Sequence, residues 1–193
     1  MLTRRDMIVA SAALASLPTR AQAASGPSED GLYHQDWFLD SFLDFSEDLA
    51  AAHAKGKRFA VLWGLKGCPA CKRMHEEHFS DAGLVDYIRA RFDILHLNIL
   101  GAREVIDFDG RKLGEKALSQ AYGIRGTPAF QFFPRTQAGL EKALAEKLLP
   151  EKREVARMPG LLEPKAFLSM FRYVFEEGYR HSNFVDWMKK DAA

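Results

Sequence analysis

The chain has 193 residues, of which 47% are hydrophobic and 27% are charged, so its length fits one globular domain with a sizeable core rather than two full domains. Its formal net charge of +1, without any block of like charge, gives no reason to expect nucleic acid as a partner. Neither internal repeats nor low-complexity tracts interrupt the sequence.

Residues 1–23 have the pattern of an export signal. Arg4 and Arg5 stand ahead of an apolar stretch, residues 7–17, and residues 21–23 form a small-x-small cleavage site. The arginine pair favours the twin-arginine route, and the apolar stretch has about half of the length that spans a bilayer, so we expect no permanent membrane anchor. These features predict a periplasmic protein. The alternative is a cytoplasmic chain with a frayed N-terminus.

Residues 24–35 are polar and interrupted by Gly and Pro, and we interpret them as a linker or an ordered lead-in to a single domain over residues 36–193. The first helix is predicted over residues 36–53. Four apolar side chains recur there at helical spacing, namely Phe38, Phe42, Phe45 and Leu49. Gly56 follows where a glycine commonly ends a helix.

Both cysteines of the chain lie where a strand is predicted to lead into a helix. Residues 59–63 are an apolar run typical of a strand covered on both faces, and residues 64–67 form a glycine-broken turn. Cys68 then stands at the helix N-terminus, where unpaired N–H groups and the helix dipole lower a thiol pKa and favour the attacking thiolate. Cys71 lies nearly one turn later on the same side, where it can resolve a mixed disulfide.

Two other roles for the cysteine pair stay open at this point, a structural disulfide and a metal site. A disulfide that closes so small a loop constrains the unfolded chain least. Cys68, Cys71, His75 and His78 follow one helix stripe, but at a rise of about 1.5 Å per residue the first and last lie about 15 Å apart, so one ion cannot bind all four. Cys68, Cys71 and His75 could still bind copper or zinc in the reduced state.

The next segments predict a β-α-β unit. Residues 80–81 cap a helix over residues 82–92, and the apolar residues between 94 and 99 form a second strand. The two strands are expected to be parallel, with a right-handed crossover. Residues 101–115 are charged and contain Asp109-Gly110, a strong turn signal, so a short surface hairpin is predicted.

A short helix over residues 116–122 ends at Gly123, and a third strand spans residues 129–133. Pro128 stands at the mouth of this strand, where a proline is unusual because it cannot donate to the ladder. Residues 134–150 follow a helical pattern. The remaining predicted elements are a fourth strand at residues 151–158, a helix from Pro164 to Gly178, and a tail over residues 182–190 that docks on the body.

The order of these elements and four motifs resemble the SoxW-like periplasmic thioredoxins, within the thioredoxin-fold thiol:disulfide oxidoreductases. The motifs are residues 67–77 with their Cys-Pro-Ala-Cys, Asp107-Phe108-Asp109-Gly110, Gly126-Thr127-Pro128 and residues 155–160. The resemblance covers residues 36–190. It implies an α/β thioredoxin fold, a central mixed sheet of about four to five strands flanked by helices, with an extra C-terminal helix.

The resemblance also implies an enzyme that reduces disulfides of exported proteins, with sulfur-oxidation proteins among the candidates. Cys68 matches the exposed nucleophile and Cys71 the resolving cysteine. Pro128 matches a cis-proline that packs against the dithiol, and the Thr127 backbone is offered to an extended substrate, beside Gly67 and Pro69. No cofactor is expected other than the redox-active disulfide between Cys68 and Cys71. The expected partners are protein disulfides and a membrane thiol donor, and the expected state is a monomer.

Three features depart from the family pattern. Many thioredoxins carry a buried aspartate six residues ahead of the first cysteine, where this chain has Leu62, so the proton acceptor for Cys71 is open. Many have tryptophan directly before that cysteine, where this chain has Gly67, which leaves a smaller and more pliable rim. Residues 134–150 are longer than a plain turn and predict an added surface helix.

Charged and polar residues follow the dithiol. Lys66, Lys72 and Arg73 favour a thiolate, or are ordinary solvated charges. His75 and Glu76 are candidates for proton handling, although the pattern predicts that both are exposed on the helix. Two alternative functions remain from the sequence alone, a copper- or zinc-binding metallochaperone and a thioredoxin-like binding module without turnover.

Overall fold

The computed structural model describes residues 31–191. The predicted export signal lies outside the described residues, as does most of the predicted linker. The end of that linker, residues 31–35, is an ordered lead-in, because Leu32 and Gln35 are buried against the domain. Within residues 31–191, no helix combines the length and the apolar character needed to cross a membrane.

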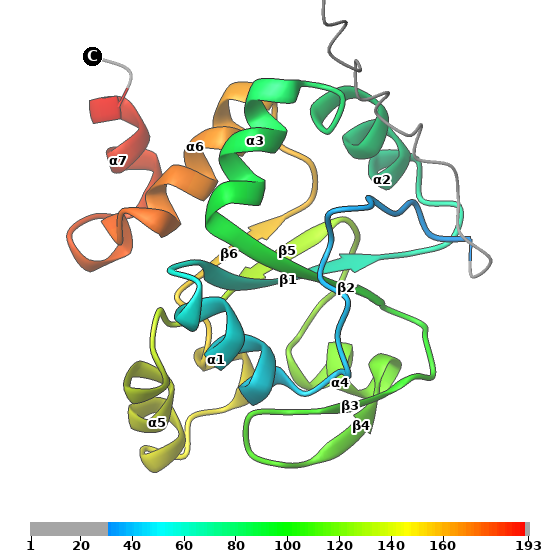
Figure 1. Ribbon diagram of the computed structural model, residues 1–193, viewed down its shortest axis with the longest axis vertical. Helices are drawn as coiled ribbons and strands as arrows, with labels where there is room; N and C mark the ends of the chain where they lie inside the picture. Colours follow the sequence, from blue (N-terminus) through cyan, green and yellow to red (C-terminus); the bar gives the residue numbers. More distant parts are fainter. Residues whose placement is uncertain (1–30, 192–193) are drawn as a thin grey trace, which may run out of the picture.

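The centre of the molecule is a four-stranded mixed sheet in the order β2, β1, β5, β6 (Figure 1). β1 (Arg58–Gly64) pairs in parallel with β2 (Phe92–Asn98) and antiparallel with β5 (Ala129–Phe132), which pairs antiparallel with β6 (Ala156–Pro159). All seven residues of β1 are buried. This arrangement confirms the mixed sheet and the parallel first pair.

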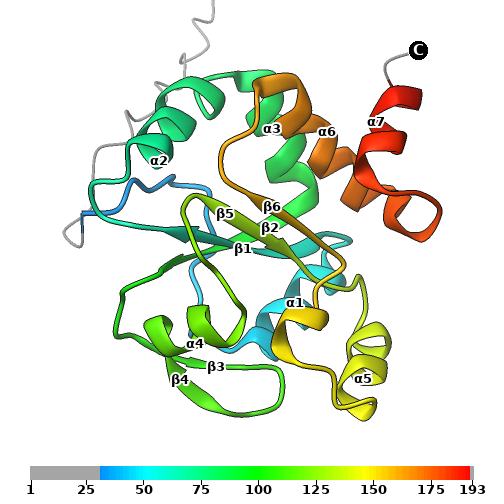
Figure 2. The ribbon, with the colours of Figure 1, turned by 180° about the vertical axis from the view of Figure 1, so that it is seen from behind.

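Helices cover both faces of the sheet (Figures 1 and 2). α3 (Ala82–Arg91) and α6 (Pro164–Phe175) lie on one face, and α1 (Phe45–Ala54) and α4 (Glu115–Ala121) lie on the other. Side chains of β1 alternate between two hydrophobic cores: Leu62 joins the cluster around Phe130 and Phe171, whereas Val61 and Trp63 join the cluster around Phe45. The two faces of β1 therefore tie the two helical layers together.

The first helix begins later than its aromatic stripe predicts. α1 starts at Phe45, where the Asp44 side chain accepts from the backbone N–H groups of Ser46 and Glu47. Residues 36–44 are not helical; Leu43 has a φ of 65°, and Phe42 is 98% exposed. The prediction of a helix from residue 36 is wrong because Phe38 reaches the core from an irregular segment that happens to match the helical spacing. The predicted end is confirmed, since Gly56 has a φ of 70°.

The charged excursion forms the predicted hairpin, β3 (Glu104–Ile106) with β4 (Lys112–Gly114), and Gly110 in its turn has a φ of 78°. The turn is fastened to the body through Asp107, which is buried. The hydroxyl of Tyr122 donates to Asp107 Oδ1 at 2.6 Å, and Arg153 Nη1 donates to Oδ2 at 2.9 Å. The motif Asp-Phe-Asp-Gly thus has a structural role in this chain.

The C-terminal half adds three helical segments to the sheet. Residues 134–150 form the predicted surface helix, α5 (Gln137–Ala145), which Thr136 caps. The predicted fourth strand is shorter than expected, because Pro150–Lys152 is a 3-10 turn and β6 begins only at Ala156. α7 (Phe184–Asp191) docks on α6, with Phe184 and Trp187 packed at 5.5 and 5.7 Å from the ring of Tyr173. The extra C-terminal helix is therefore confirmed.

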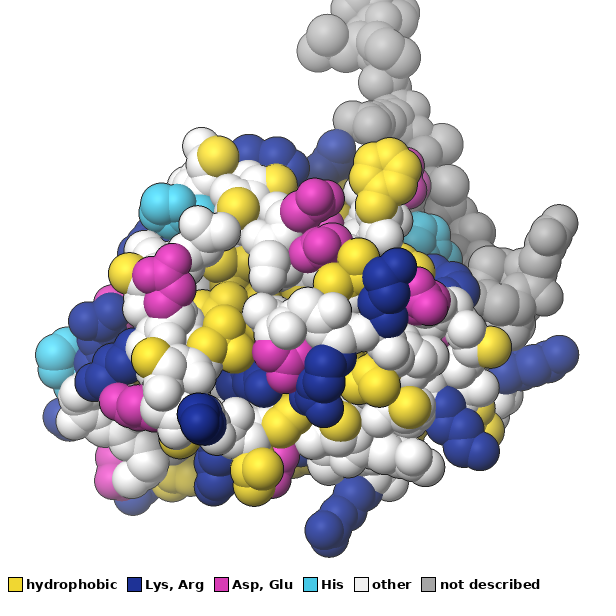
Figure 3. Space-filling view, turned by 90° about the horizontal axis from the view of Figure 1, so that it is seen from below, with side chains coloured by type: hydrophobic (Ala, Val, Ile, Leu, Met, Phe, Trp, Pro, Cys, Tyr) yellow, Lys and Arg dark blue, Asp and Glu magenta, His cyan; other side chains and the backbone are white. Residues whose placement is uncertain are grey.

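The surface seen from below carries acidic and basic side chains side by side (Figure 3). Several of them form ion pairs, such as Lys112 with Glu104 at 3.2 Å on the hairpin. This interspersed pattern agrees with the small formal net charge of +1.

The burial of the Asp48 carboxyl leads to a prediction about the stability of the fold. Asp48 on α1 is 8% exposed, and burial raises its pKa from 3.8 to about 6, although Ser41 Oγ donates to it at 2.7 Å. Well below pH 3.8 the group is protonated in both the folded and the unfolded state; above about pH 6 it is ionised in both, and folding then costs about 2–3 kcal/mol at this residue. Asp48→Asn should therefore raise the free energy of unfolding in urea at pH 7.5.

The gain should disappear at pH 4, where the native carboxyl is already neutral. Glu47→Gln is the matched control, since it removes the same charge one residue earlier from an exposed position. An equal effect of Asp48→Asn at both pH values would contradict the assigned cause.

Candidate active site

The end of β1 delivers the two cysteines to the sheet edge. After Gly64 the chain turns through Leu65–Gly67, where Gly67 has a φ of 74°, and Cys68 becomes the N-cap of α2 (Pro69–Arg73). Pro69 occupies the first helical position, where its missing N–H costs nothing. The local sequence therefore fixes both cysteines at the start of a helix, as predicted.

Cys68 and Cys71 are joined in a disulfide. The backbone N–H of Cys71 donates to Cys68 Sγ at 3.1 Å, so the same donor faces the nucleophilic sulfur once the bond is reduced. The expectation that Cys68 is exposed needs correction: Cys68 is 8% exposed and Cys71 4%. Cys68 is the more accessible sulfur, but as a helix cap it sits beneath the facing loop.

That facing loop contains the predicted cis peptide bond, Thr127-Pro128. The carbonyl oxygen of Thr127 lies 3.4 Å from Cys68 Sγ, and Pro128 is buried. Beside it is an open groove of about 320 Å³ lined by the loop and the end of β6, namely by residues 123–127, Ala129, Arg157, Pro159 and Gly160. The loop thus offers a wall and a groove next to the disulfide.

The rim around the disulfide is open on the other side. Gly67 and Pro69 are exposed, and a Cβ added at Gly67 would meet no atom within 4 Å. Lys66 is exposed, and its aliphatic chain lies against Gly31. Among the described residues, no atom therefore lies within 4 Å of the point where a larger side chain would begin at this position.

The positive charge near the dithiol is smaller than predicted. Lys72 Nζ lies 3.7 Å from a carboxylate oxygen of Glu76, and Arg73 Nε lies 3.4 Å from Glu77. Both pairs are exposed and join residues one turn apart. Glu76, predicted to handle protons, is thus on the outer face of the helix and paired with a lysine.

His75 is buried, which corrects the prediction of an exposed residue. α2 continues into one π-helical turn, η1 (Met74–His78), in which Met74, His75 and His78 are buried on the same side as Cys71. His75 is 3% exposed; its Nδ1 lies 3.0 Å from Gln35 Nε2, and its Nε2 has no hydrogen-bond partner within residues 31–191. Burial, and secondly the nearby His34, lower the pKa of His75 to about 4. The ring is therefore neutral at pH 7.

His78 points to a different region from the disulfide. Its Nε2 is 2.8 Å from the carbonyl oxygen of Leu162, and its ring packs on Phe167. Among residues 31–191, no three His, Cys, Asp or Glu side chains are placed to hold a metal ion together.

Sequence reasoning missed His96, which the fold brings to the site. His96 pairs in register with Leu62 across the parallel strands, so the two side chains emerge on the same face of the sheet. Its Nε2 fills the space above Gly64, where a Cβ would overlap it. The alternation of side chains along the strand could have indicated this position. Phe92 and Ile94, at the alternate positions before His96, are core residues of the same face.

The comparisons with known proteins concern the same region. The family model described as a thioredoxin-like domain matches residues 45–143. The structure is similar to a thioredoxin-fold protein from Helicobacter pylori, with 19% identity and a TM-score of 0.51, over 70% of this chain and 80% of that one. These two findings agree on the fold.

Two further solved structures are similar at lower scores. A thioredoxin from Thermus thermophilus is 24% identical with a TM-score of 0.46, over 72% of this chain and 95% of that one. A putative disulphide-isomerase from Bacteroides thetaiotaomicron is 19% identical with a TM-score of 0.48, over 80% and 97%. No curated protein matches the sequence.

The close approach of His96 to Gly64 allows a prediction about the cost of a larger side chain at position 64. Gly64→Ala places a methyl group against the imidazole and should lower the free energy of unfolding in urea by about 1–3 kcal/mol. In a His96→Ala background the same substitution should cost much less, because the opposing ring is gone. Gly126→Ala is the control, since a Cβ there meets nothing within 4 Å. Equal costs of Gly64→Ala in both backgrounds would refute the assigned contact.

Proposed function

Because the chain belongs to the thioredoxin-like domain family, we propose that it is a periplasmic thiol:disulfide oxidoreductase that reduces disulfides of exported proteins. The observation that carries the proposal is the Cys68–Cys71 disulfide at a helix N-cap, with Thr127-Pro128 packed against it and an open groove along the same loop. A structural staple would not need a groove beside it. The Cys71 N–H, which points at Cys68 Sγ, supports Cys68 as the thiolate.

The reaction runs in two exchange steps from the reduced enzyme. Cys68 thiolate attacks one sulfur of the substrate disulfide, the substrate S–S bond breaks, and the first substrate thiolate leaves and takes a proton from water. Cys71 then attacks Cys68 Sγ, the mixed disulfide breaks, and the second substrate thiol leaves. Two electrons pass from the dithiol to the substrate, and the enzyme disulfide forms.

A thiol reductant must return these two electrons. The export-signal pattern of residues 1–23 supports a periplasmic location, where no glutathione buffer maintains thiols, so the donor is a membrane protein with a reactive dithiol. The resemblance to SoxW-like thioredoxins makes exported sulfur-oxidation proteins the candidate substrates. The protein is expected to act as a monomer, with the groove beside Thr127 receiving an extended segment of the substrate.

Trapping the intermediate tests the assigned roles. Cys71→Ser should accumulate disulfide-linked partners through Cys68, because the first step proceeds and the second cannot. Cys68→Ser should trap none, which makes it the matched control. The measurement is non-reducing electrophoresis of the protein isolated from cells after acid quenching. If neither variant captured partners, a binding module without turnover would replace the enzyme.

The reduction potential tests the direction of electron flow. A reductase should equilibrate nearer to thioredoxin, about −270 mV, than to the oxidant DsbA, about −120 mV. Equilibration with defined ratios of reduced and oxidised dithiothreitol or glutathione gives the value, and the double variant Cys68→Ser/Cys71→Ser, which has no thiol, provides the zero for the thiol readout. A value near −120 mV would make the protein an oxidase and overturn the reductive assignment alone.

A further inference from the structure

Cys71 must lose a proton before it can attack the mixed disulfide, because the thiolate is the nucleophile. Its side chain is 4% exposed, and apolar burial raises a thiol pKa. Leu62 lines the same cavity and has no group that can accept a proton. The acceptor must therefore come from other residues around the sulfur.

Two imidazoles line the narrow cavity beside Cys71, those of His75 and His96. Their ring centroids are 6.1 Å apart. Among the described residues, Tyr33 is the one remaining ionisable side chain along this cavity besides Cys71 itself. The cavity has no room for a water molecule, so the side chains themselves are the available bases.

Backbone register places His96 at this position. It lies beside Leu62 on the same face of the sheet, and Gly64 leaves the space that its Nε2 occupies. His75 arrives from the other side of the cavity, one turn after Cys71 on the helix. Within residues 31–191, the buried Nε2 of His75 has no hydrogen-bond partner. Its Nδ1 contacts the side-chain amide of Gln35, and this amide can turn either its NH₂ or its oxygen towards the ring. Gln35 can therefore stabilise both the neutral ring and the imidazolium.

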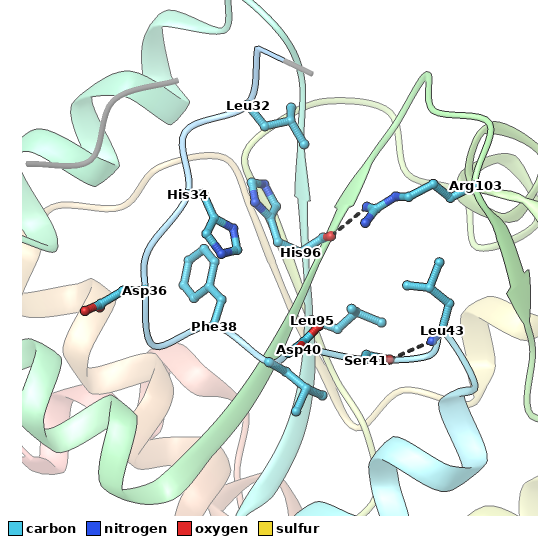
Figure 4. Close-up of a pocket in the computed structure, with 11 residues that line it drawn as sticks. Leu32, His34, Asp36, Phe38, Asp40, Ser41, Leu43, Leu95, His96 and Arg103 are labelled. Carbon is cyan, nitrogen blue, oxygen red and sulfur yellow. Dashed lines mark hydrogen bonds between the residues drawn. The ribbon is translucent and has the colours of Figure 1, made fainter. Parts of the chain in front are cut away.

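The charges around the pair come from four neighbouring segments. They are Tyr33, His34, Asp36 and Asp40 in the lead-in, Lys66 after β1, Lys72 with Glu76 on the helix, and Arg103 after β2. Figure 4 shows that Asp36 points away from His96, whereas Arg103 Nη2 donates to the carbonyl oxygen of His96 at 3.0 Å. Burial and His34 keep His75 neutral, so its ring has a lone pair to offer at pH 7.

His96 also lines a second pocket, which opens to solvent. This open pocket of about 290 Å³ adjoins the buried cavity, and both share His96 and Leu32 in their linings (Figure 4). The ring of His34 stacks on that of His96 at 6.2 Å within this pocket. His96 thus lies between the cavity beside Cys71 and the open, polar pocket.

We propose that the imidazole pair of His75 and His96 accepts the Cys71 proton in the second exchange step and releases it through the open pocket. This inference rests on the proposed function. The S–H bond of Cys71 breaks as its sulfur attacks Cys68 Sγ, and one imidazole becomes imidazolium. The imidazolium proton then passes to water, or to the departing substrate thiolate, which restores the neutral ring. No electrons beyond the two of the exchange are involved.

Single-turnover kinetics with the aromatic disulfide DTNB separate the two steps, since one coloured thiolate is released in each and leaves without protonation. In His75→Gln/His96→Gln the first release should change less than about twofold. The second should slow by about 100-fold or more, the usual range for loss of an acid–base group. Its rate should then rise about tenfold per pH unit from pH 6 to 8, as expected for an unassisted thiol. The wild-type rate should be level over that range.

His78→Gln is the matched control, because His78 is buried on the same π-helical turn but contacts Leu162 and Phe167. It should leave both releases unchanged. If the double variant does not fold, the inference is tested with the single His75→Gln variant and with the pH profile of the wild-type second release. A wild-type second step that rises tenfold per pH unit, or variants with unchanged second release, would overturn the inference. A wild-type protein that releases neither thiolate would instead refute the proposed function.

Discussion

Complete burial of β1, on both faces and along both edges, is the constraint on which the site depends. Because β1 is paired in register with β2 and β5, its last residue fixes where the turn and the dithiol helix begin. The same register places Leu62 beside His96 and Trp63 beside Ala129, the residue after Pro128. A register shift of one residue would move each of these side chains to the opposite face of the sheet, so both cores and the site depend on the same strand pairing.

Local hydrogen bonds act directly on Cys68 Sγ, whereas the cations that follow it on the helix are engaged with carboxylates. Lys72 and Arg73 are exposed and paired with Glu76 and Glu77. A hydrogen bond from the Cys71 N–H to a thiolate is worth about 1.5–3 kcal/mol. The Thr127 carbonyl, 3.4 Å from the sulfur, acts in the opposite direction, because it accepts from a thiol and repels a thiolate. The N–H and the carbonyl together therefore tune the nucleophile.

Elements with strong local signals could be predicted from the sequence. The apolar run of β1, the Asp109-Gly110 turn and the Cys-Pro-Ala-Cys junction each determine their own backbone. The start of α1 could not be predicted, because Phe38 reaches the core from an irregular segment with helical spacing. His75 follows Cys71 by four residues and shares its helix face, but the residues that cover that face, Gln35 and Phe38, lie far away in the sequence, so its burial could not be predicted locally. His96 is set by strand pairing, which lies outside any local window.

The surroundings of the cavity beside Cys71, formed by the lead-in and by β1, explain why a neutral imidazole suits it better than a charged group. An ionised carboxylate at Leu62 would be buried at neutral pH throughout the cycle, and burying a charge without a partner is costly. A neutral imidazole avoids that cost while the disulfide is closed, and it becomes charged only when a thiolate forms beside it. Gln35, held by the ordered lead-in, can follow this change by rotating its amide. The lead-in thus contacts a side chain of the cavity beside Cys71, although Gln35 lies 33 residues before Cys68 in the sequence.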